Sequence, residues 1–364
     1  MASPLRPALE GLVYSLVYQC ERGAAMPERG VVDCGLYVSG VRDPLPRTFV
    51  EALAHARSRP HAFVWVDLQD PGADEILDLA QAFDLHELAV EDVMHGERRP
   101  GVEIYEAMVL CSMQIARYVP HGELTEFSDV VETGTVWLFV AQHYVITLRR
   151  GGGRVMTLPG VQHRLEGEPA VLTAGPWAVA YALFDWAVES YIDCATEVGR
   201  DVEALEESVF DGVGRRSSTQ RIYRFKREVV ELRRAVVPLQ RPVESIVAGH
   251  VSMVPPDARN EFRILSDHLS RVVDQVISFD DLVGSMLQAH LAQIDVDQNS
   301  DMRKIAAWAA IAAVWGLVAG LYQMSEDIPA LHGKNGVVTL TATLVVSLAV
   351  SGFLYRSFRR QGWL

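Results

Sequence analysis

The chain has 364 residues, of which 49% are hydrophobic, and its formal net charge is −14 at pH 7. This length is enough for a soluble domain of ordinary size together with a membrane part. The acidic balance argues against nucleic acid as a partner, because phosphate binding requires a basic surface. The four cysteines form no CxxC pair, so zinc-finger and redox motifs are not expected; they are Cys20, Cys34, Cys111 and Cys194.

The first part of the chain has a mixed pattern. Four apolar runs rich in β-branched residues predict strands at Val31–Val38, Phe63–Leu68, Met108–Ile115 and Val136–Leu148, the last with a break near Gln142. The segment Asp74–Phe83 has the 3–4 spacing of a helix. We therefore expect residues 1–170 to form a cytoplasmic α/β domain, with an α+β arrangement as the alternative.

A charged helical hairpin is predicted over residues 171–256. One helical run extends from Pro176 to about Phe210, and a second extends from about Thr219 towards Pro238. The first run is rich in acidic residues and the second in basic residues. An antiparallel arrangement would pair these charges, although exposed ion pairs contribute little each.

A stalk helix is predicted over residues 257–304. Apolar residues recur there in steps of three and four, which indicates a helix packed along another helix. These residues are Phe262, Leu265, Leu269, Val272, Val276, Phe279, Val283 and Met286. A continuous helix from Asp257 to Met324 would be about 100 Å long at 1.5 Å per residue. Because such a rod needs neighbours, we expect an oligomer.

Two uncharged apolar segments close the chain. We predict transmembrane helices at 305–324 and 337–355, an external loop at 325–336 and a basic cytoplasmic tail at 356–364. Basic residues flank the two segments on the same side, namely Arg303, Lys304, Arg356, Arg359 and Arg360. The positive-inside rule then predicts a multi-pass protein of the cell membrane with both termini cytoplasmic, and the lipid bilayer as a partner.

Several blocks of sequence carry a family resemblance. They are WVDLQDPGADEILDLAQAF and the residues that follow it up to position 106, IYRFKREVVELRRAVVPLQ at 222–240, FRILSDHLSRVVDQV at 262–276, and the C-terminal YRSFRRQGWL. From about Phe63 onward the chain resembles the CorA family of magnesium and cobalt transporters. The resemblance implies a funnel-shaped homopentamer with a pore lined by the first membrane helix. It also implies Mg²⁺ or another divalent cation as the transported ion, without a tightly bound cofactor. No Ser/His/Asp or paired-carboxylate constellation is visible, so enzymatic activity is not expected.

The predicted outer mouth departs from the family pattern. The family's first span ends in Tyr-Gly-Met-Asn, whose asparagine ring is regarded as the selectivity element. This chain reads Tyr322-Gln323-Met324-Ser325 at that place. The resemblance places a metal-contacting mouth at Gln323, Met324, Ser325, Glu326 and Asp327.

The family's magnesium sensor is also altered. The family places an acidic residue on the stalk at the position of Ile264, opposite an acidic residue of a neighbouring subunit. Isoleucine supplies no oxygen ligand for a hard cation. Asp92 is retained as the remnant of that site, and Asp267 lies one turn from Ile264. We expect magnesium sensing to be impaired.

Alignment of the first span with the family gives a pore face. Its members follow one helix face in steps of three and four and are Asn299, Met302, Ile305, Ala309, Ala313, Gly316 and Gly320. The alternative is that these small residues only allow close helix packing. Met302 and Ile305 are the bulky apolar members, so they would form a hydrophobic constriction that gates by dewetting.

Three functions remain open at this point. The first is passive magnesium or cobalt transport, and the second is zinc transport similar to that of the related ZntB proteins. The third is a non-conducting, membrane-anchored sensor or interaction protein. The altered mouth and sensor favour the third, whereas Asn299, Met302 and the rest of the pore face favour the first two.

Overall fold

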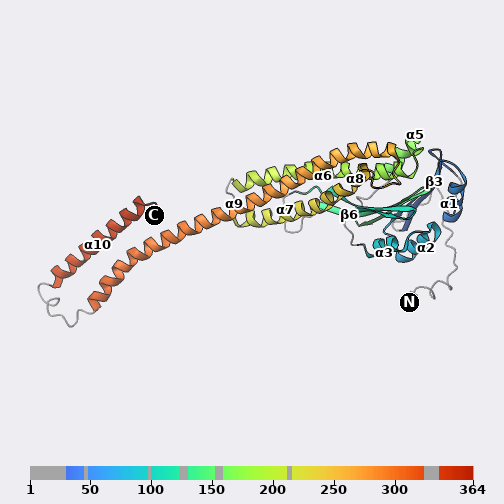
Figure 1. Ribbon diagram of the computed structural model, residues 1–364. Helices are drawn as coiled ribbons and strands as arrows, with labels where there is room; N and C mark the ends of the chain where they lie inside the picture. Colours follow the sequence, from blue (N-terminus) through green and yellow to red (C-terminus); the bar gives the residue numbers. More distant parts are fainter. Residues whose placement is uncertain are drawn as a thin grey trace. The chain divides into compact units, whose positions relative to one another are not determined.

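The structure, a computed structural model, describes residues 30–44, 48–96, 100–122, 130–151, 159–210, 215–323 and 336–363. The chain divides into two compact units, Met1–Gly284 and Ser285–Leu364. The first unit contains a sheet with helices on both faces (Figure 1). The second contains the end of a long helix and the C-terminal helix.

The described strands form one mixed sheet in the order β2-β1-β3-β7-β6-β5-β4. The central pair β3 and β7 is parallel, and the other neighbouring strands are antiparallel. The strands are β1 (Gly30–Val38), β2 (Val41–Arg42), β3 (Ala62–Gln69), β4 (Gly101–Tyr105), β5 (Met108–Tyr118), β6 (Val131–Ala141) and β7 (Tyr144–Gly151). All four predicted strand runs are confirmed, and the break near Gln142 is the turn between β6 and β7. The short strands β2 and β4 were not predicted.

Three short helices cover one face of the sheet (Figure 1). They are α1 (Phe49–Ser58), α2 (Ala73–Phe83) and α3 (Glu87–His95). Thr48 and Glu51 form a reciprocal capping box at the start of α1, and the Glu75 carboxylate accepts the backbone N–H of Gly72 at 2.8 Å before α2. Each helix buries an apolar stripe against the strands. Only α2 was predicted from the sequence.

The opposite face carries the remaining helices of the first unit. They are α4 (Pro159–Gly167), α5 (Pro169–Leu172), α6 (Pro176–Phe210), α7 (Arg215–Val236), the 3₁₀ turn η3 (Val237–Leu239), α8 (Gln240–Val247) and the first part of α9 (Pro256–Gln323). Helices α6 and α7 pack on β5 and β6. The buried Glu228 carboxylate of α7 accepts the backbone N–H groups of Val130 and Val131, at 2.9 and 3.1 Å. This contact fixes α7 to the start of β6.

The predicted apolar seam of α9 is buried. Its members from Phe262 to Met286 are inaccessible to solvent, except that Phe279 is half-buried. A Cβ atom on Gly199 of α6 would lie 3.0 Å from Cζ of Phe279, so glycine permits the close approach of α6 and α9.

Two basic side chains of α7 form ion pairs with α9. Lys226 Nζ and Arg233 Nη1 lie 2.6 and 2.9 Å from the Asp280 carboxylate. The hairpin prediction assigned the basic residues of α7 to the acidic residues of α6. Lys226 and Arg233 pair with α9 instead, because α9 lies close to α7 and carries the nearly buried Asp280.

A buried ion pair links the two parallel strands. Nη2 of Arg149 on β7 lies 2.6 Å from Oδ2 of Asp67 on β3, and Nε lies 3.1 Å from Oδ1. The two side chains are 1% and 7% exposed. Desolvation raises the pKa of Asp67 to about 6, although the Arg149 guanidinium acts in the opposite direction. The carboxyl group is therefore ionised at neutral pH and depends on Arg149 as its partner.

Removal of one member of this pair should destabilise the sheet more than removal of both. We expect Arg149→Met to lower the opening free energy of β3 and β7 by about 3–5 kcal/mol, because it leaves a buried carboxylate unpaired. The double variant Asp67→Leu with Arg149→Met should lose much less. Hydrogen exchange of the β3 and β7 amides in the full-length protein measures both values.

Arg117→Met, at an exposed position near the end of β5, is the control, with an expected change within about 0.5 kcal/mol. Equal losses in the single and double variants would show that Asp67 and Arg149 do not depend on one another.

Candidate functional site

The second unit contains two helices that are long and apolar enough to span a membrane. They are the end of α9 and α10 (Gly336–Arg360), with windows of mean hydropathy 1.4 and 1.3. Only 6% of each apolar window is buried within the chain. A soluble protein would bury such segments, so their exposure indicates that lipid or other protein surfaces cover them.

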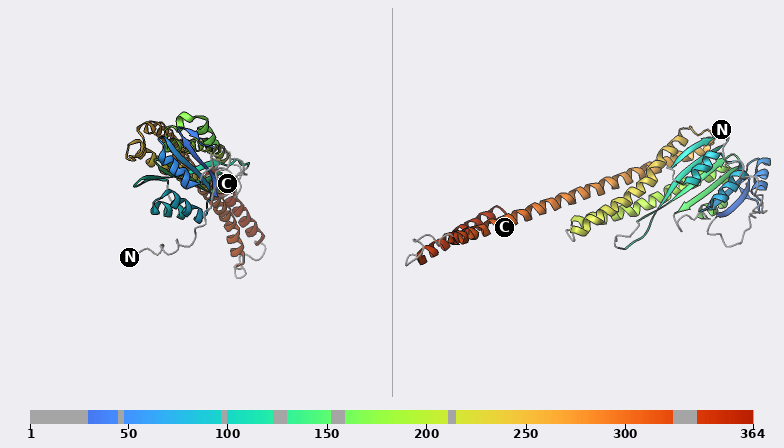
Figure 2. Two further views of the ribbon diagram at one scale, coloured as in Figure 1. Left: turned by 90° about the vertical axis from the view of Figure 1, so that its right-hand side faces the viewer. Right: turned by 90° about the horizontal axis from the view of Figure 1, so that it is seen from below.

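Helix α10 runs beside the last part of α9 (Figures 1 and 2). The less exposed side chains of α9 here share one face and are Ala307, Ala310, Ile311, Val314 and Val318. On α10, Ser347 is 4% exposed, and its hydroxyl donates to the carbonyl of Thr343 at 2.7 Å. Because α10 is the neighbouring helix, we infer that it covers this face of α9, named here the packing face.

The predicted pore face lies on another side of α9. All seven residues from Asn299 to Gly320 are exposed, including Met302 at 60% and Ile305 at 62%. At 100° per residue, the centre of this face lies roughly 140° from the packing face. Added Cβ atoms at Gly316 and Gly320 would meet nothing within 4 Å. The seven residues therefore share an exposed side of α9 that lies away from the packing face.

Asn299 has a local partner that the sequence analysis missed. Its carboxamide oxygen accepts the Nε–H of Arg303 at 3.1 Å, one turn further along α9. The i, i+4 spacing could have indicated this contact. The neighbouring Lys304 Nζ lies 3.0 Å from Asp301 Oδ1.

Of the predicted outer mouth, only Gln323 is among the described residues. Gln323 is the last residue of α9, and Met324, Ser325, Glu326 and Asp327 lie outside the described ranges. Their role in the mouth stays a prediction.

The remnant of the predicted sensor lies on α3. Asp92 is half-buried, and its Oδ2 is 3.1 Å from the hydroxyl of Tyr105, which is also 2.6 Å from Oε2 of Glu103. The single hydroxyl proton of Tyr105 can serve one carboxylate at a time. On α9, Ile264 is 54% exposed and Asp267 is exposed. Within the described part of the chain, no group of three or more His, Cys, Asp and Glu side chains could hold a metal ion.

Several known proteins are similar to this chain over most of its length. The chain is 26% identical over 293 residues to the cobalt/magnesium transport protein CorA of Thermotoga maritima, covering 80% of each chain. Its fold is similar to the complete CorA structure of Methanocaldococcus jannaschii, with a TM-score of 0.63, 17% identity and coverage of 83% of this chain and 92% of that chain. The full-length CmaX structure gives a TM-score of 0.67 at 15% identity, covering 93% of this chain and all of that chain.

Residues 60–360 match the family described as CorA-like Mg²⁺ transporter protein. This range includes strands β3 to β7, helices α2 to α8, and both membrane helices. Together with the solved structures, this match confirms the predicted α/β domain, long helix and two C-terminal membrane helices, and it identifies a transporter family rather than an enzyme family. The chain is a membrane protein with two C-terminal transmembrane helices, and it belongs to the CorA-like Mg²⁺ transporter family.

Proposed function

We propose that the protein conducts divalent metal cations, of the magnesium and cobalt kind, through a pore formed by the α9 helices of five identical chains. The observation that carries this proposal is the pore face from Asn299 to Gly320, which is exposed and lies away from the packing face. Small residues at Ala309, Ala313, Gly316 and Gly320 suit helices that approach closely around an axis. The relatives named as magnesium or cobalt transport proteins support the choice of ion.

The driving force for such a pathway is the membrane potential. For an ion of charge two it amounts to about 4.6 kcal/mol per 100 mV. No cofactor is required, because the potential itself supplies the free energy. The cation is cargo that passes through the protein.

The gate in this proposal is the constriction at Met302 and Ile305. Both side chains are apolar and more than half exposed on the pore face. Rings of such side chains close a narrow pore by excluding water. Asn299 lies one turn before Met302. The carboxamide oxygen of Asn299 accepts a hydrogen bond from the Nε–H of Arg303.

Selectivity at the mouth is proposed to be weak. An asparagine ring can accept hydrogen bonds from the water shell of a cation, whereas Ser325 would offer only a short hydroxyl. Gln323 has a longer carboxamide, but two residues correspond to about 200° around a regular helix. Its side chain would therefore face away from the axis unless the helix unwinds near Tyr322.

Regulation by magnesium is proposed to be impaired. Ile264 is exposed on α9 and supplies no ligand, and Asp92 already lies within hydrogen-bond distance of Tyr105. A ligand shifts a conformational equilibrium only by its difference in affinity for the two states. Magnesium should then have little effect on the cytoplasmic domain.

The oligomeric state tests the pore directly. We expect the mass of the protein in detergent, corrected for bound detergent, to equal five chains, because a pore lined by the pore face requires α9 helices from several copies. A stable monomer or dimer would contradict the pore.

Limited proteolysis tests the sensor. We expect millimolar magnesium to leave the cleavage rate of the parent protein unchanged, whereas Ile264→Asp should gain severalfold protection because it restores an oxygen ligand. Asp267→Asn in the parent is the matched control and should change nothing. Strong protection of the parent that Asp267→Asn abolishes would show that Asp267 has replaced the lost acid.

Metal uptake into proteoliposomes tests the mouth. The double variant Gln323→Gly with Ser325→Asn should raise magnesium flux severalfold over the parent, because it restores a ring of amide oxygens. Cobalt, nickel and zinc are measured in parallel, and Thr341→Ser on α10 serves as the control with parental flux. A variant that assembles normally but carries no more magnesium would show that the mouth does not limit transport. The stretch from Met302 to Ile305 would then be the next region to test.

A further inference from the structure

Helices α6 and α7 each have one exposed face, and the two faces carry opposite charge. On α6 the exposed polar residues recur in steps of three and four, and they are Glu189, Asp193, Thr196, Arg200, Glu203 and Glu207. We name this set the acidic stripe. The corresponding residues of α7 are Gln220, Tyr223, Arg227, Val230 and Arg234, of which only Val230 is half-buried. We name this set the basic stripe.

Most charges of the two stripes have no partner of opposite sign in their own chain. Arg200 is an exception, since its Nη1 lies 2.5 Å from Oε1 of Glu197. Oε2 of Glu189 lies 3.8 Å from Nη1 of Arg164 on α4. The stripe residues that form no ion pair within the described part of the chain are Asp193, Glu203, Glu207, Arg227 and Arg234.

The two stripes lie on opposite flanks of the helical layer. Helices α6 and α7 contact each other, both pack on β5 and β6, and both contact α9. At 100° per residue, each stripe is centred roughly 170° from the buried face of its own helix. The acidic stripe therefore faces away from α7, and the basic stripe faces away from α6.

The stripes also match in height along the two helices. The hydroxyl of Tyr191 on α6 lies 3.4 Å from the carbonyl oxygen of Ala235 on α7, so these two residues mark one level. Counted from that level, three pairs of residues lie at the same height to within one residue, namely Asp193 with Arg234, Thr196 with Val230, and Glu203 with Tyr223. A rotation about an axis parallel to the helices preserves height. The acidic stripe of one copy would then meet the basic stripe of the next copy with these pairs at the same level.

Apolar surface accompanies the charges. Tyr223 is 69% exposed in the basic stripe, and Ile192 is 38% exposed beside the acidic stripe. Tyrosine and arginine are enriched in protein interfaces. Because an exposed ion pair contributes little by itself, contacts of these side chains have to supply part of the binding free energy.

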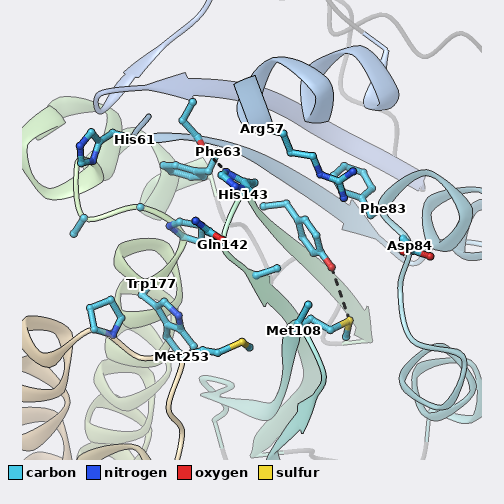
Figure 3. A pocket seen from close by; sticks show the side chains of 18 of the residues that line it. Arg57, His61, Phe63, Phe83, Asp84, Met108, Gln142, His143, Trp177 and Met253 are labelled. Carbon is cyan, nitrogen blue, oxygen red and sulfur yellow. Dashed lines mark hydrogen bonds between the residues drawn. The ribbon is translucent and has the colours of Figure 1, made fainter. Parts of the chain in front are cut away.

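The stripes are separate from a cavity of about 950 Å³ that lies at the start of α6 (Figure 3). Phe63, Phe83 and Trp177 border this cavity but are only 1–5% exposed, so they pack within the protein. None of the stripe residues borders it. The charged flanks are therefore an outer surface of the helical layer.

We propose that the acidic stripe of one chain binds the basic stripe of a second copy of this chain. Each copy then uses its two flanks for two different neighbours, so the contact is head-to-tail and can close into a ring. Opposite charges on the two flanks fix the order and the register of the copies. This inference rests on the proposed pore, because it places the contact in the ring of chains whose α9 helices surround the axis.

Crosslinking of the full-length protein in detergent tests the contact. Thr196→Cys with Val230→Cys places one thiol on each stripe at the same height, with both helices between the two thiols of one chain. A short bis-maleimide should link these thiols between copies and give a ladder of up to five chains on a denaturing gel. Each single variant is a control and should give no ladder, and the native cysteines in the described part of the chain are buried.

Charge reversal tests the cause of the contact. In the protein with both new thiols, Arg227→Glu with Arg234→Glu should lower the yield of the ladder severalfold, because like charges then face each other. Asp193→Lys with Glu203→Lys should lower it in the same way. The four changes together restore opposite charges and should restore the yield.

A matched control changes the charge elsewhere. Arg59→Glu with Arg117→Glu alters the net charge as much as the reversal in the basic stripe, at exposed positions outside both stripes. The yield of the ladder should stay at the parental value.

Several results would overturn the inference. A protein with the mass of five chains that gives no ladder would exclude this contact and leave the pore proposal standing, whereas a monomer would contradict both. An unchanged yield after either reversal, no recovery when the four changes are combined, or an equal loss in the matched control would show that the stripe charges do not make the contact. A loss on reversal of the arginines alone would assign the basic stripe to another anionic partner, such as lipid headgroups.

Discussion

Helix α9 is one continuous helix whose two parts lie in different surroundings. Up to Val283 it buries one apolar seam and exposes polar side chains on its other faces. From Ile305 to Tyr322 it carries no charge at all. In hydrocarbon an unsatisfied backbone polar group costs several kcal/mol, and a continuous helix satisfies these groups internally. The helical conformation is therefore common to both parts, while the side chains change to match the surroundings.

In the first unit, several contacts converge on α9. Gly199 of α6 permits close contact with Phe279, and Lys226 and Arg233 of α7 hold Asp280. Helix α7 is in turn fixed to β6, because Glu228 accepts the N–H groups of Val130 and Val131. A change in the sheet can thus reach α9 through two packed helices. Such a change in the sheet alters transport only if it shifts an element that has two alternative conformations, and if the pore also favours one of the two.

The family fold is retained at low sequence identity. Similarity to the solved CorA and CmaX structures extends over most of the chain at 17% and 15% identity. Such a fold depends on apolar patterning and volume, which many sequences satisfy. An ion site depends on particular oxygen atoms, so the residues of such a site can differ between relatives without a change of fold.

The sequence by itself determined the membrane helices, the seam of α9 and the longer strands, because each has a local periodicity or an uninterrupted apolar run. It also placed Asn299 to Gly320 on one helix face, which the helical geometry of α9 reproduces. Only the tertiary structure decided that Asp280 is the partner of Lys226 and Arg233, and that Asp67 and Arg149 pair across β3 and β7. It alone also revealed the cavity lined by His61, His86 and His143. These features join residues that are tens of positions apart, and no periodicity in one sequence records which distant segments meet when the chain buries its apolar surface.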